Sequence, residues 1–211
     1  MPKLQDMLEA GEGQQLDFKK TIGEAAKIAK SMVAFANSAG GKLLIGVRDD
    51  RTITGIRSDE EIFMLETASL IHCTPPIVFF TKLHHYQGKT IVEAYVPESK
   101  EKPHKAKDEA GKWKVFIRVK DEVKLASPEA IDLMKKKRVG KEQLFTCSPP
   151  EMELLRSLET EGLVSVISHS RKTGIPRWKV SKMLINLCLA GLAKLHHGPD
   201  GDYFTPLETL Q

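Results

Sequence analysis

Cysteine is scarce in this chain of 211 residues, which contains Cys73, Cys147 and Cys188 and no Cys-x-x-Cys spacing. An odd, widely spaced set predicts neither a disulfide framework nor a zinc ribbon. Long apolar runs are also missing, since none approaches the ~18 residues that a membrane span needs. The N-terminus lacks the basic and then apolar pattern of a secretory signal. We therefore expect a soluble cytoplasmic protein with no membrane partner.

Acidic residues are missing from one long stretch near the C-terminus. Between Glu161 and Asp200 there are six Lys or Arg residues and no Asp or Glu. The formal net charge of the chain is +4, and residues 162–211, with six basic and three acidic residues, contribute +3 of it. A positive excess gathered in one segment favours a docking face for phosphates over a generally sticky protein.

The same stretch is patterned as two helices around a tight turn. Residues 163–172 predict a short helix, 173–175 a turn, and 176–189 a second helix with Pro176 at its first position, where a missing N–H costs nothing. Four apolar residues at helical spacing predict the buried stripe of the second helix: Val180, Met183, Leu184 and Leu187.

Residues 192–205 predict two short strands around a turn at 198–201. Together with the two helices, the segment 148–207 resembles the winged helix-turn-helix domain of bacterial transcriptional regulators. The resemblance implies double-stranded DNA as the partner, with the second helix in the major groove. An ordinary solvated basic face of a small helical domain is the alternative interpretation. The expected phosphate contacts are Arg171, Lys172 and Lys194, and the expected contacts to base edges are Arg177, Lys179, Ser181 and Lys182.

The first part of the chain alternates predicted strands and helices. This order predicts an α+β class with a mixed sheet, followed by the mostly helical C-terminal domain. The predicted strands are 16–20, 43–47, 77–86, 89–96 and 113–119, and the predicted helices are 23–38 and 59–72.

A domain boundary is expected where a basic helix end meets a glycine and then a proline pair. We assign residues 1–138 to the first domain, 139–150 to a linker, and 151–211 to the second domain, whose first helix covers 151–160. The basic run 135–138 is interpreted as the favourable charge of a helix C-terminus rather than as a phosphate contact.

Several short motifs of the first domain carry a family resemblance. Glu12 precedes Asp17-Phe-Lys19, then a helix ends in Ala-Phe-Ala-Asn-x-x-Gly-Gly at 34–41, and the next strand continues into Ile-Gly-Val-x-Asp at 45–49. This series resembles the AlbA-type domain of the Schlafen family, over about residues 3–138. The resemblance implies a nucleic-acid-binding domain. Later landmarks of the same family are Pro75-Pro76-Ile77, Val96-Pro-Glu-Ser99, Lys102-Pro103 and Phe116-Ile-Arg-Val119.

Three carboxylates of this domain, Glu12, Asp17 and Asp49, are candidate catalytic residues. Acids gathered at one place hold Mg²⁺ or Mn²⁺ and activate water for phosphodiester cleavage. The resemblance implies the same, because some Schlafen proteins cleave RNA with three acids in this region. Position 17 departs from the usual Glu of the family, and Arg51 stands where a Gly commonly follows. Ordinary turn and strand acids are therefore the favoured interpretation, and no metal or other cofactor is expected outside the nuclease alternative.

Other potential sites are weaker. Gly40-Gly41-Lys42 is not a Walker loop, because it follows a helix and precedes a strand, so it predicts a helix stop. The adjacent pairs His84-His85 and His196-His197 alternate across a strand and are not expected to chelate one metal ion. Arg118 is interpreted as a solvated strand residue.

The sequence therefore predicts a two-domain, nucleic-acid-binding transcriptional regulator, with a homodimer formed through the first domain. A metal-dependent nuclease centred on Glu12, Asp17 and Asp49 is the alternative of a different class, and a protein-interaction module is the third. Enzymatic activity is not favoured.

Overall fold

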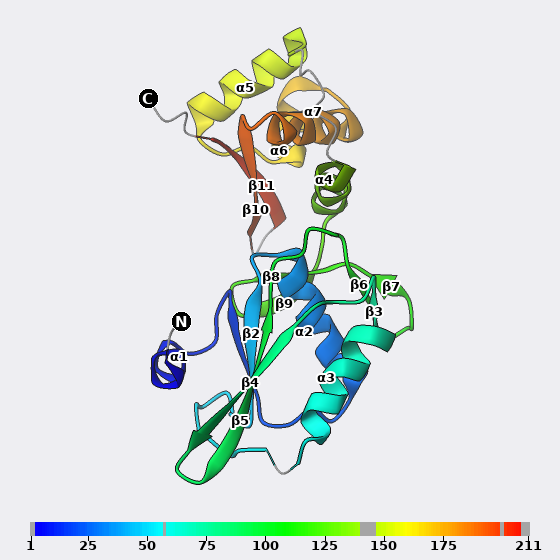
Figure 1. Ribbon diagram of the computed structural model, residues 1–211. Coiled ribbons are helices and arrows are strands. Elements are labelled where there is room, and N and C mark those ends of the chain that lie inside the picture. Colours follow the sequence, from blue (N-terminus) through cyan, green and yellow to red (C-terminus); the bar gives the residue numbers. More distant parts are fainter. Residues whose placement is uncertain (1–2, 57, 140–146, 199–200, 208–211) are drawn as a thin grey trace. The chain divides into compact units, whose positions relative to one another are not determined.

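The computed structural model describes residues 3–56, 58–139, 147–198 and 201–207 (Figure 1). The chain separates into two compact units, Met1–Ala126 and Ser127–Gln211, and each unit has its own hydrophobic core. Within the described ranges no helix combines the length and the apolar character needed to cross a bilayer.

The first unit is built on a mixed sheet with the strand order β1-β2-β5-β4. β1 (Leu16–Lys19) runs parallel to β2 (Gly41–Ile45), and β2 pairs in antiparallel fashion with β5 (Lys89–Val96), which pairs in the same way with β4 (Phe80–Tyr86). Helix α2 (Ala25–Asn37) connects the two parallel strands, as a parallel pair requires a crossover. This arrangement confirms the α+β class predicted from the sequence.

Helix α2 covers one face of the sheet and supplies most of the main core. Its alanine-rich sequence suits a helix and allows close packing, and ten of its thirteen residues are buried. Helix α3 (Glu60–Ile71) packs against it. The largest side chains of this core that have no exposed surface are Met32, Phe35, Leu43, Ile45 and Leu65.

The glycine pair after α2 is required by the close approach of the chain on both sides. Gly40 adopts a left-handed φ of 71°, and its amide donates to the Phe35 carbonyl at the end of the helix. A Cβ atom at Gly41 would lie 2.2 Å from the Phe35 ring. The pair therefore ends the helix and starts β2, as the sequence predicts, and forms no phosphate loop.

The opposite face of the sheet is partly covered by α1 (Leu4–Ala10). Met7 of this helix packs into a second apolar cluster with Phe18, Leu44 and Ile91, which come from three neighbouring strands. Two small sheets complete the unit: β3 (Cys73–Thr74) with β6 (Lys105–Lys107) and β7 (Trp113–Lys114), and β8 (Phe116–Val119) with β9 (Glu122–Leu125).

The predicted strand 113–119 is divided between these two sheets. β7 ends at Lys114 and β8 begins at Phe116, while the carbonyl of Val115 between them accepts a hydrogen bond from the Ala126 amide. The chain thus changes sheet at Val115. Because both halves are rich in β-forming residues, the local sequence gives no sign of the change.

The second unit contains four helices and a hairpin among its described residues. α5 (Pro149–Glu161), α6 (Val166–Thr173) and α7 (Arg177–Leu189) are followed by β10 (Ala193–Gly198) and β11 (Gly201–Pro206), which pair in antiparallel fashion. An isolated bridge between Val164 and Phe204 joins the hairpin to the chain just before α6. Leu154, Leu158, Leu184 and Leu187 form part of the core.

The second unit also includes α4 (Pro128–Val139), which the sequence interpretation assigned to the first domain. α4 packs against α7, and Leu133 is part of the core of the second unit. Of the predicted linker 139–150, residues 140–146 lie outside the described residues. Pro149 and Pro150 do not precede α5 but occupy its first turn, where the Ser148 hydroxyl and the Glu151 carboxylate form a capping box.

Candidate nucleic-acid interface

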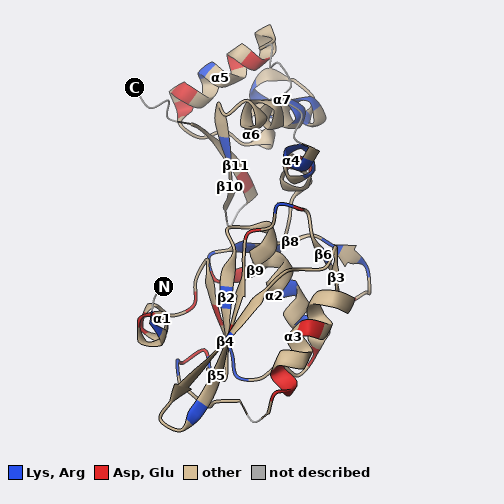
Figure 2. Ribbon diagram, viewed as in Figure 1, with Lys and Arg blue, Asp and Glu red and all other residues tan. Residues whose placement is uncertain are grey.

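The basic residues of the acid-free stretch lie on the outside of the second unit. Figure 2 shows Lys and Arg on α7 and α4. Of the seven residues predicted to contact nucleic acid, six are exposed, namely Arg171, Lys172, Arg177, Lys179, Lys182 and Lys194, and Ser181 is half-buried. Exposed cations with no acid between them in sequence form a surface that attracts phosphate.

Local signals position the two helices that carry most of these residues. The Ser165 hydroxyl caps α6 by accepting a hydrogen bond from the Ser168 amide at 3.1 Å. Gly174 ends α6 in the left-handed region, with φ of 74°. Pro176 is the N-cap residue of α7, so the helix begins at Arg177, one residue later than predicted. Arg177 and Lys179 therefore lie in the first turn of α7, where backbone N–H groups also attract anions.

The buried stripe of α7 agrees with the helical spacing of the sequence. Val180, Met183, Leu184 and Leu187 are all buried, so the predicted stripe is confirmed. The opposite side of the helix is exposed, and Trp178 there has 70% of its surface accessible. The helix is thus held by its apolar side and presents Trp178, Lys179 and Lys182 to solvent.

The hairpin uses its two histidines internally. The His196 ring stacks on the Tyr203 ring at 5.1 Å, and its Nε2 lies 2.9 Å from the Thr205 hydroxyl oxygen. The His197 Nδ1 lies 2.8 Å from the Asp202 carboxylate. Each of the two rings therefore has its own partner within the hairpin.

The structure brings together two of the three candidate catalytic carboxylates. Glu12 lies beside Asp17, and its pKa is raised because burial removes water from the carboxyl group and the neighbouring Asp17 carboxylate disfavours a second negative charge. The Phe18 amide donates to the same Glu12 carboxylate at 2.8 Å. Asp49 is exposed in the turn after β2. Among the described residues no three His, Cys, Asp or Glu side chains are grouped to hold a metal ion.

Asp17 has cationic partners that explain its place in the fold. Its carboxylate lies 3.0 Å from the Lys19 ammonium and 3.4 Å from the Arg118 guanidinium. Arg118 also donates to the carbonyls of Gly13 and Leu16 and lies over the Phe35 ring. With 3% of its surface exposed, Arg118 is a buried structural residue. The expectation that Arg118 is solvated is therefore wrong. Its positive charge can be buried because the Asp17 carboxylate balances it inside the protein.

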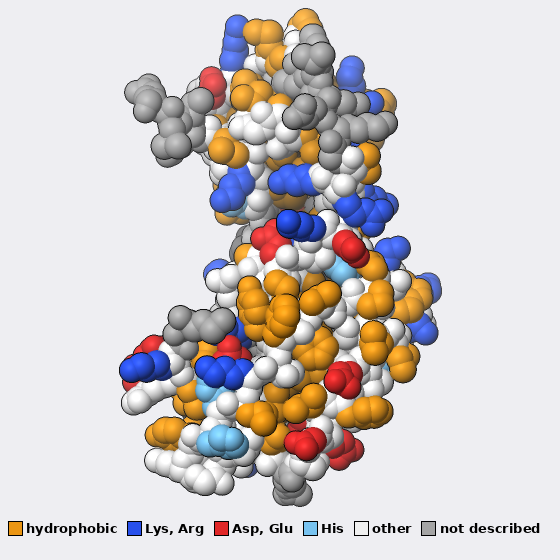
Figure 3. All heavy atoms as spheres, viewed as in Figure 1, with side chains coloured by type: hydrophobic (Ala, Val, Ile, Leu, Met, Phe, Trp, Pro, Cys, Tyr) orange, Lys and Arg blue, Asp and Glu red, His pale blue; other side chains and the backbone are white. Residues whose placement is uncertain are grey.

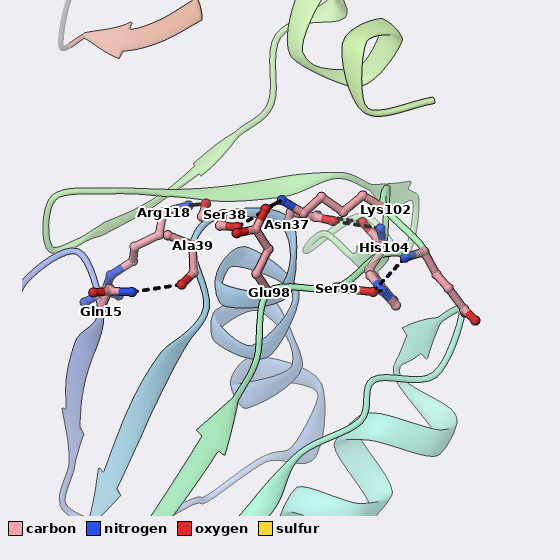
Figure 4. A network of polar contacts seen from close by, with 10 residues as sticks. Gln15, Asn37, Ser38, Ala39, Glu98, Ser99, Lys102, His104 and Arg118 are labelled. Carbon is pink, nitrogen blue, oxygen red and sulfur yellow. Dashed lines mark hydrogen bonds and ion pairs between the residues drawn. The ribbon is translucent and has the colours of Figure 1, made fainter. Parts of the chain in front are cut away.

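Several landmarks of the sequence motifs meet at the C-terminal end of α2 (Figure 4). The Asn37 side-chain amide donates to the carbonyls of His104 and Phe116 at 2.9 and 2.8 Å, and its oxygen accepts from the His104 amide. The His104 Nε2 lies 2.7 Å from the Ser99 hydroxyl. This buried network joins three segments that are far apart in sequence. The sequence motifs include most of the residues of this network, but they do not predict which of these residues form hydrogen bonds with one another.

Comparison with known proteins gives one family match for the first unit. The model of the family described as Schlafen, AlbA_2 matches residues 12–127, and no curated protein matches the chain. The DIP2311 protein of Corynebacterium diphtheriae is 20% identical with a TM-score of 0.47, and the match covers 70% of this chain and 30% of that one. The N-terminal domain of a RecG-related protein of Nitrosomonas europaea, described as related to an ATP-dependent DNA helicase, is also 20% identical. Its TM-score is 0.44, with coverage of 71% of this chain and 97% of that domain.

Proposed function

The chain belongs to the Schlafen AlbA_2 family, and from this premise we propose that it is a nucleic-acid-binding transcriptional regulator that docks on double-stranded DNA through its second unit. The family match points to nucleic-acid binding in general. The observation that carries the finer proposal is the set of exposed cations on α6, α7 and β10, which lie on a helix-turn-helix followed by a hairpin.

The proposed docking uses α7 as the recognition helix of a winged helix. Its N-terminal half carries Lys179 and Lys182 on the exposed side, and a helix of this kind enters the major groove by that end. Arg177, Lys179, Ser181 and Lys182 are assigned to base edges, and Arg171, Lys172 and Lys194 are assigned to phosphates. The β10–β11 hairpin takes the place of the wing.

The packing of α4 against α7 supports a wider phosphate surface than the sequence suggested. Lys135, Lys137 and Arg138 at the C-terminal end of α4 are exposed. Lys137 lies close enough to α7 for its charge to affect the buried Cys188 thiol, whose pKa burial raises to about 11. We therefore extend the proposed phosphate contacts to this end of α4, in place of a purely helix-dipole role.

A homodimer completes the proposal. One winged domain reads few base pairs, whereas two domains related by a two-fold axis read half-sites one helical turn, about 34–36 Å, apart. The first unit is the proposed dimer contact. A mass in solution equal to two chains supports the dimer, and a monomer at micromolar concentration contradicts this part of the proposal.

The direct test is fluorescence-polarisation binding to duplex DNA, single-stranded DNA and structured RNA over a salt series. The assay contains Mn²⁺, and product lengths are checked by gel. The proposal predicts steeply salt-dependent duplex binding with intact products. Shortened products from the wild type but not from Asp17→Asn would indicate the nuclease alternative. Absence of any nucleic-acid binding would leave a protein-interaction module.

A further inference from the structure

One face of the first unit's sheet is left open next to α1. In the antiparallel pairing of β4 with β5, Phe80 lies opposite Tyr95 and Lys82 lies opposite Glu93. Opposite residues project from the same face of a sheet. The α1 helix covers this face at the β1 and β2 side, where Met7 packs, but Phe80 is 60% and Tyr95 is 39% exposed. Two large rings therefore lie in solvent, one on the edge strand β4 and one on its neighbour β5.

The two rings form an ordered stack. Their centroids are 6.4 Å apart and their planes differ by 23°. Both side chains rise from paired strand positions, so the backbone hydrogen bonds of the ladder fix their spacing. Figure 3 shows hydrophobic side chains grouped over the first unit, in the area where β4 and β5 lie in Figure 1.

The part of this face formed by β4 and β5 has an exposed cation, and its carboxylate is buried and paired. Glu93 is buried and lies 2.7 Å from the Lys42 ammonium and 2.6 Å from the His84 Nε2. These contacts lower the pKa of Glu93 against the opposing effect of burial, which keeps the carboxylate ionised and neutralised by its partners. Lys82, two residues from Phe80, is exposed. An anion approaching the rings thus meets Lys82 and no exposed carboxylate of β4 or β5 on this face.

We propose that this face of β4 and β5 binds single-stranded nucleic acid, with unpaired bases stacked on Phe80 and Tyr95 and the backbone phosphates held by Lys82. An exposed aromatic pair on a sheet, beside a cation, is suited to bases that are free to leave a helix. A duplex keeps its base faces inside, so it offers these rings nothing to stack on. The site lies in the first unit and does not depend on the proposed duplex contacts of the second.

The test uses the full chain and a labelled oligodeoxythymidine, with the labelled oligouridine in parallel. Phe80→Ala is expected to weaken binding about tenfold or more, the loss of one stacked base, while Phe80→Tyr keeps most of the affinity. Lys82→Ala is expected to reduce the salt slope by about 0.7, the value for one phosphate contact on a single strand. Circular dichroism confirms that each variant is folded.

Two controls separate this site from other effects. Phe63→Ala removes a ring of similar exposure, 64%, from α3 of the same unit and is expected to leave binding unchanged. The double variant Lys179→Ala/Lys182→Ala is expected to keep single-strand binding while it loses duplex binding. Equal single-strand affinity of the wild type and Phe80→Ala overturns the proposal. A Phe80→Ala variant that changes the mass in solution but not the affinity also overturns it, because the face is then a contact between protein chains.

Discussion

The Lys172 ammonium lies 2.5 Å from the Glu161 carboxylate, at the edge of the basic surface of the second unit. Both side chains are more than one third exposed, so this pair contributes little to stability. It matters for binding instead. Lys172 is one of the residues assigned to phosphate, and the Glu161 carboxylate is its partner in the free protein. Under the proposed docking, Glu161 therefore competes with DNA phosphate for Lys172.

Glu161→Gln is therefore expected to raise the affinity for duplex DNA by a factor of about two to five, because the variant frees Lys172 from an exposed pair worth up to about 1 kcal/mol. The salt slope should steepen by at most about 0.9, the value for one additional phosphate contact. The measurement is duplex binding by fluorescence polarisation over a salt series. Glu159→Gln, another exposed acid of α5, is the control. Unchanged affinity in Glu161→Gln alone would place Lys172 outside the interface.

Lowering the pH is expected to destabilise both units through buried histidines. Burial lowers the pKa of His169 and of His104 below the ordinary value of 6.5. Below that pH the histidines of the unfolded chain take up protons, whereas the folded rings stay neutral. The contribution of these rings to the free energy of unfolding is therefore fully present above about pH 6.5 and is lost as the pH falls towards the folded pKa values. Denaturant unfolding at several pH values between about 7 and 5 measures the effect.

His169→Gln tests the assignment, since glutamine does not titrate. The variant is expected to reduce the pH dependence of the second unit's unfolding, whatever its stability at neutral pH. His85→Gln, at an exposed position, controls for the loss of a histidine. An identical pH dependence in wild type and His169→Gln would show that another group carries it.

Asn37→Ala is expected to destabilise the first unit by about 3 kcal/mol, because it leaves the buried carbonyls of His104 and Phe116 and the His104 amide without their partner. Denaturant unfolding gives the loss. Gln15→Ala removes one exposed side-chain bond to the Ala39 carbonyl and is expected to change stability by less than about 0.5 kcal/mol. Similar losses in both variants would contradict a special role for the Asn37 network.

Asp17→Asn is expected to lower stability by about 2 kcal/mol or more, since it leaves the buried Arg118 guanidinium without its carboxylate. It is not expected to change any Mn²⁺-dependent cleavage, because Asp49 is not grouped with Glu12 and Asp17 in the described structure. Unfolding curves and product lengths on a gel are measured on the same preparation. A fully stable variant that has lost a cleavage activity of the wild type would restore the nuclease alternative.

Periodic patterns in the sequence were sufficient to predict which side chains are buried where burial depends on a single helix or strand. The spacing of Val180, Met183, Leu184 and Leu187 predicts the buried side of α7, because a helix that packs on one side repeats every 3.6 residues. The order of helices and strands similarly predicts the mixed sheet. The glycine pair at 40–41 predicts the end of α2, since few residues other than glycine adopt the left-handed conformation that Gly40 has.

Features that depend on partners distant in sequence were not predictable in this way. Arg118 is buried because Asp17, 101 residues earlier, neutralises it. The assignment of α4 to the second unit depends on Leu133, which packs in that core. The two-residue turn at 87–88 sets Phe80 opposite Tyr95, but the exposure of both rings depends on how far α1 covers that face of the sheet.

The salt dependence of duplex DNA binding in Lys179→Ala/Lys182→Ala tests the central claim most directly. A lysine that enters the major groove neutralises part of the DNA charge and releases counterions even where it reaches a base edge, so the loss of each lysine lowers the slope of log affinity against log salt concentration by up to about 0.9. A variant with Lys20→Ala and Lys100→Ala loses the same charge from exposed positions of the first unit. We predict weaker binding and a reduced slope in the α7 variant, with wild-type behaviour in the control. Equal slopes in wild type and both variants would contradict the assignment of α7 to DNA.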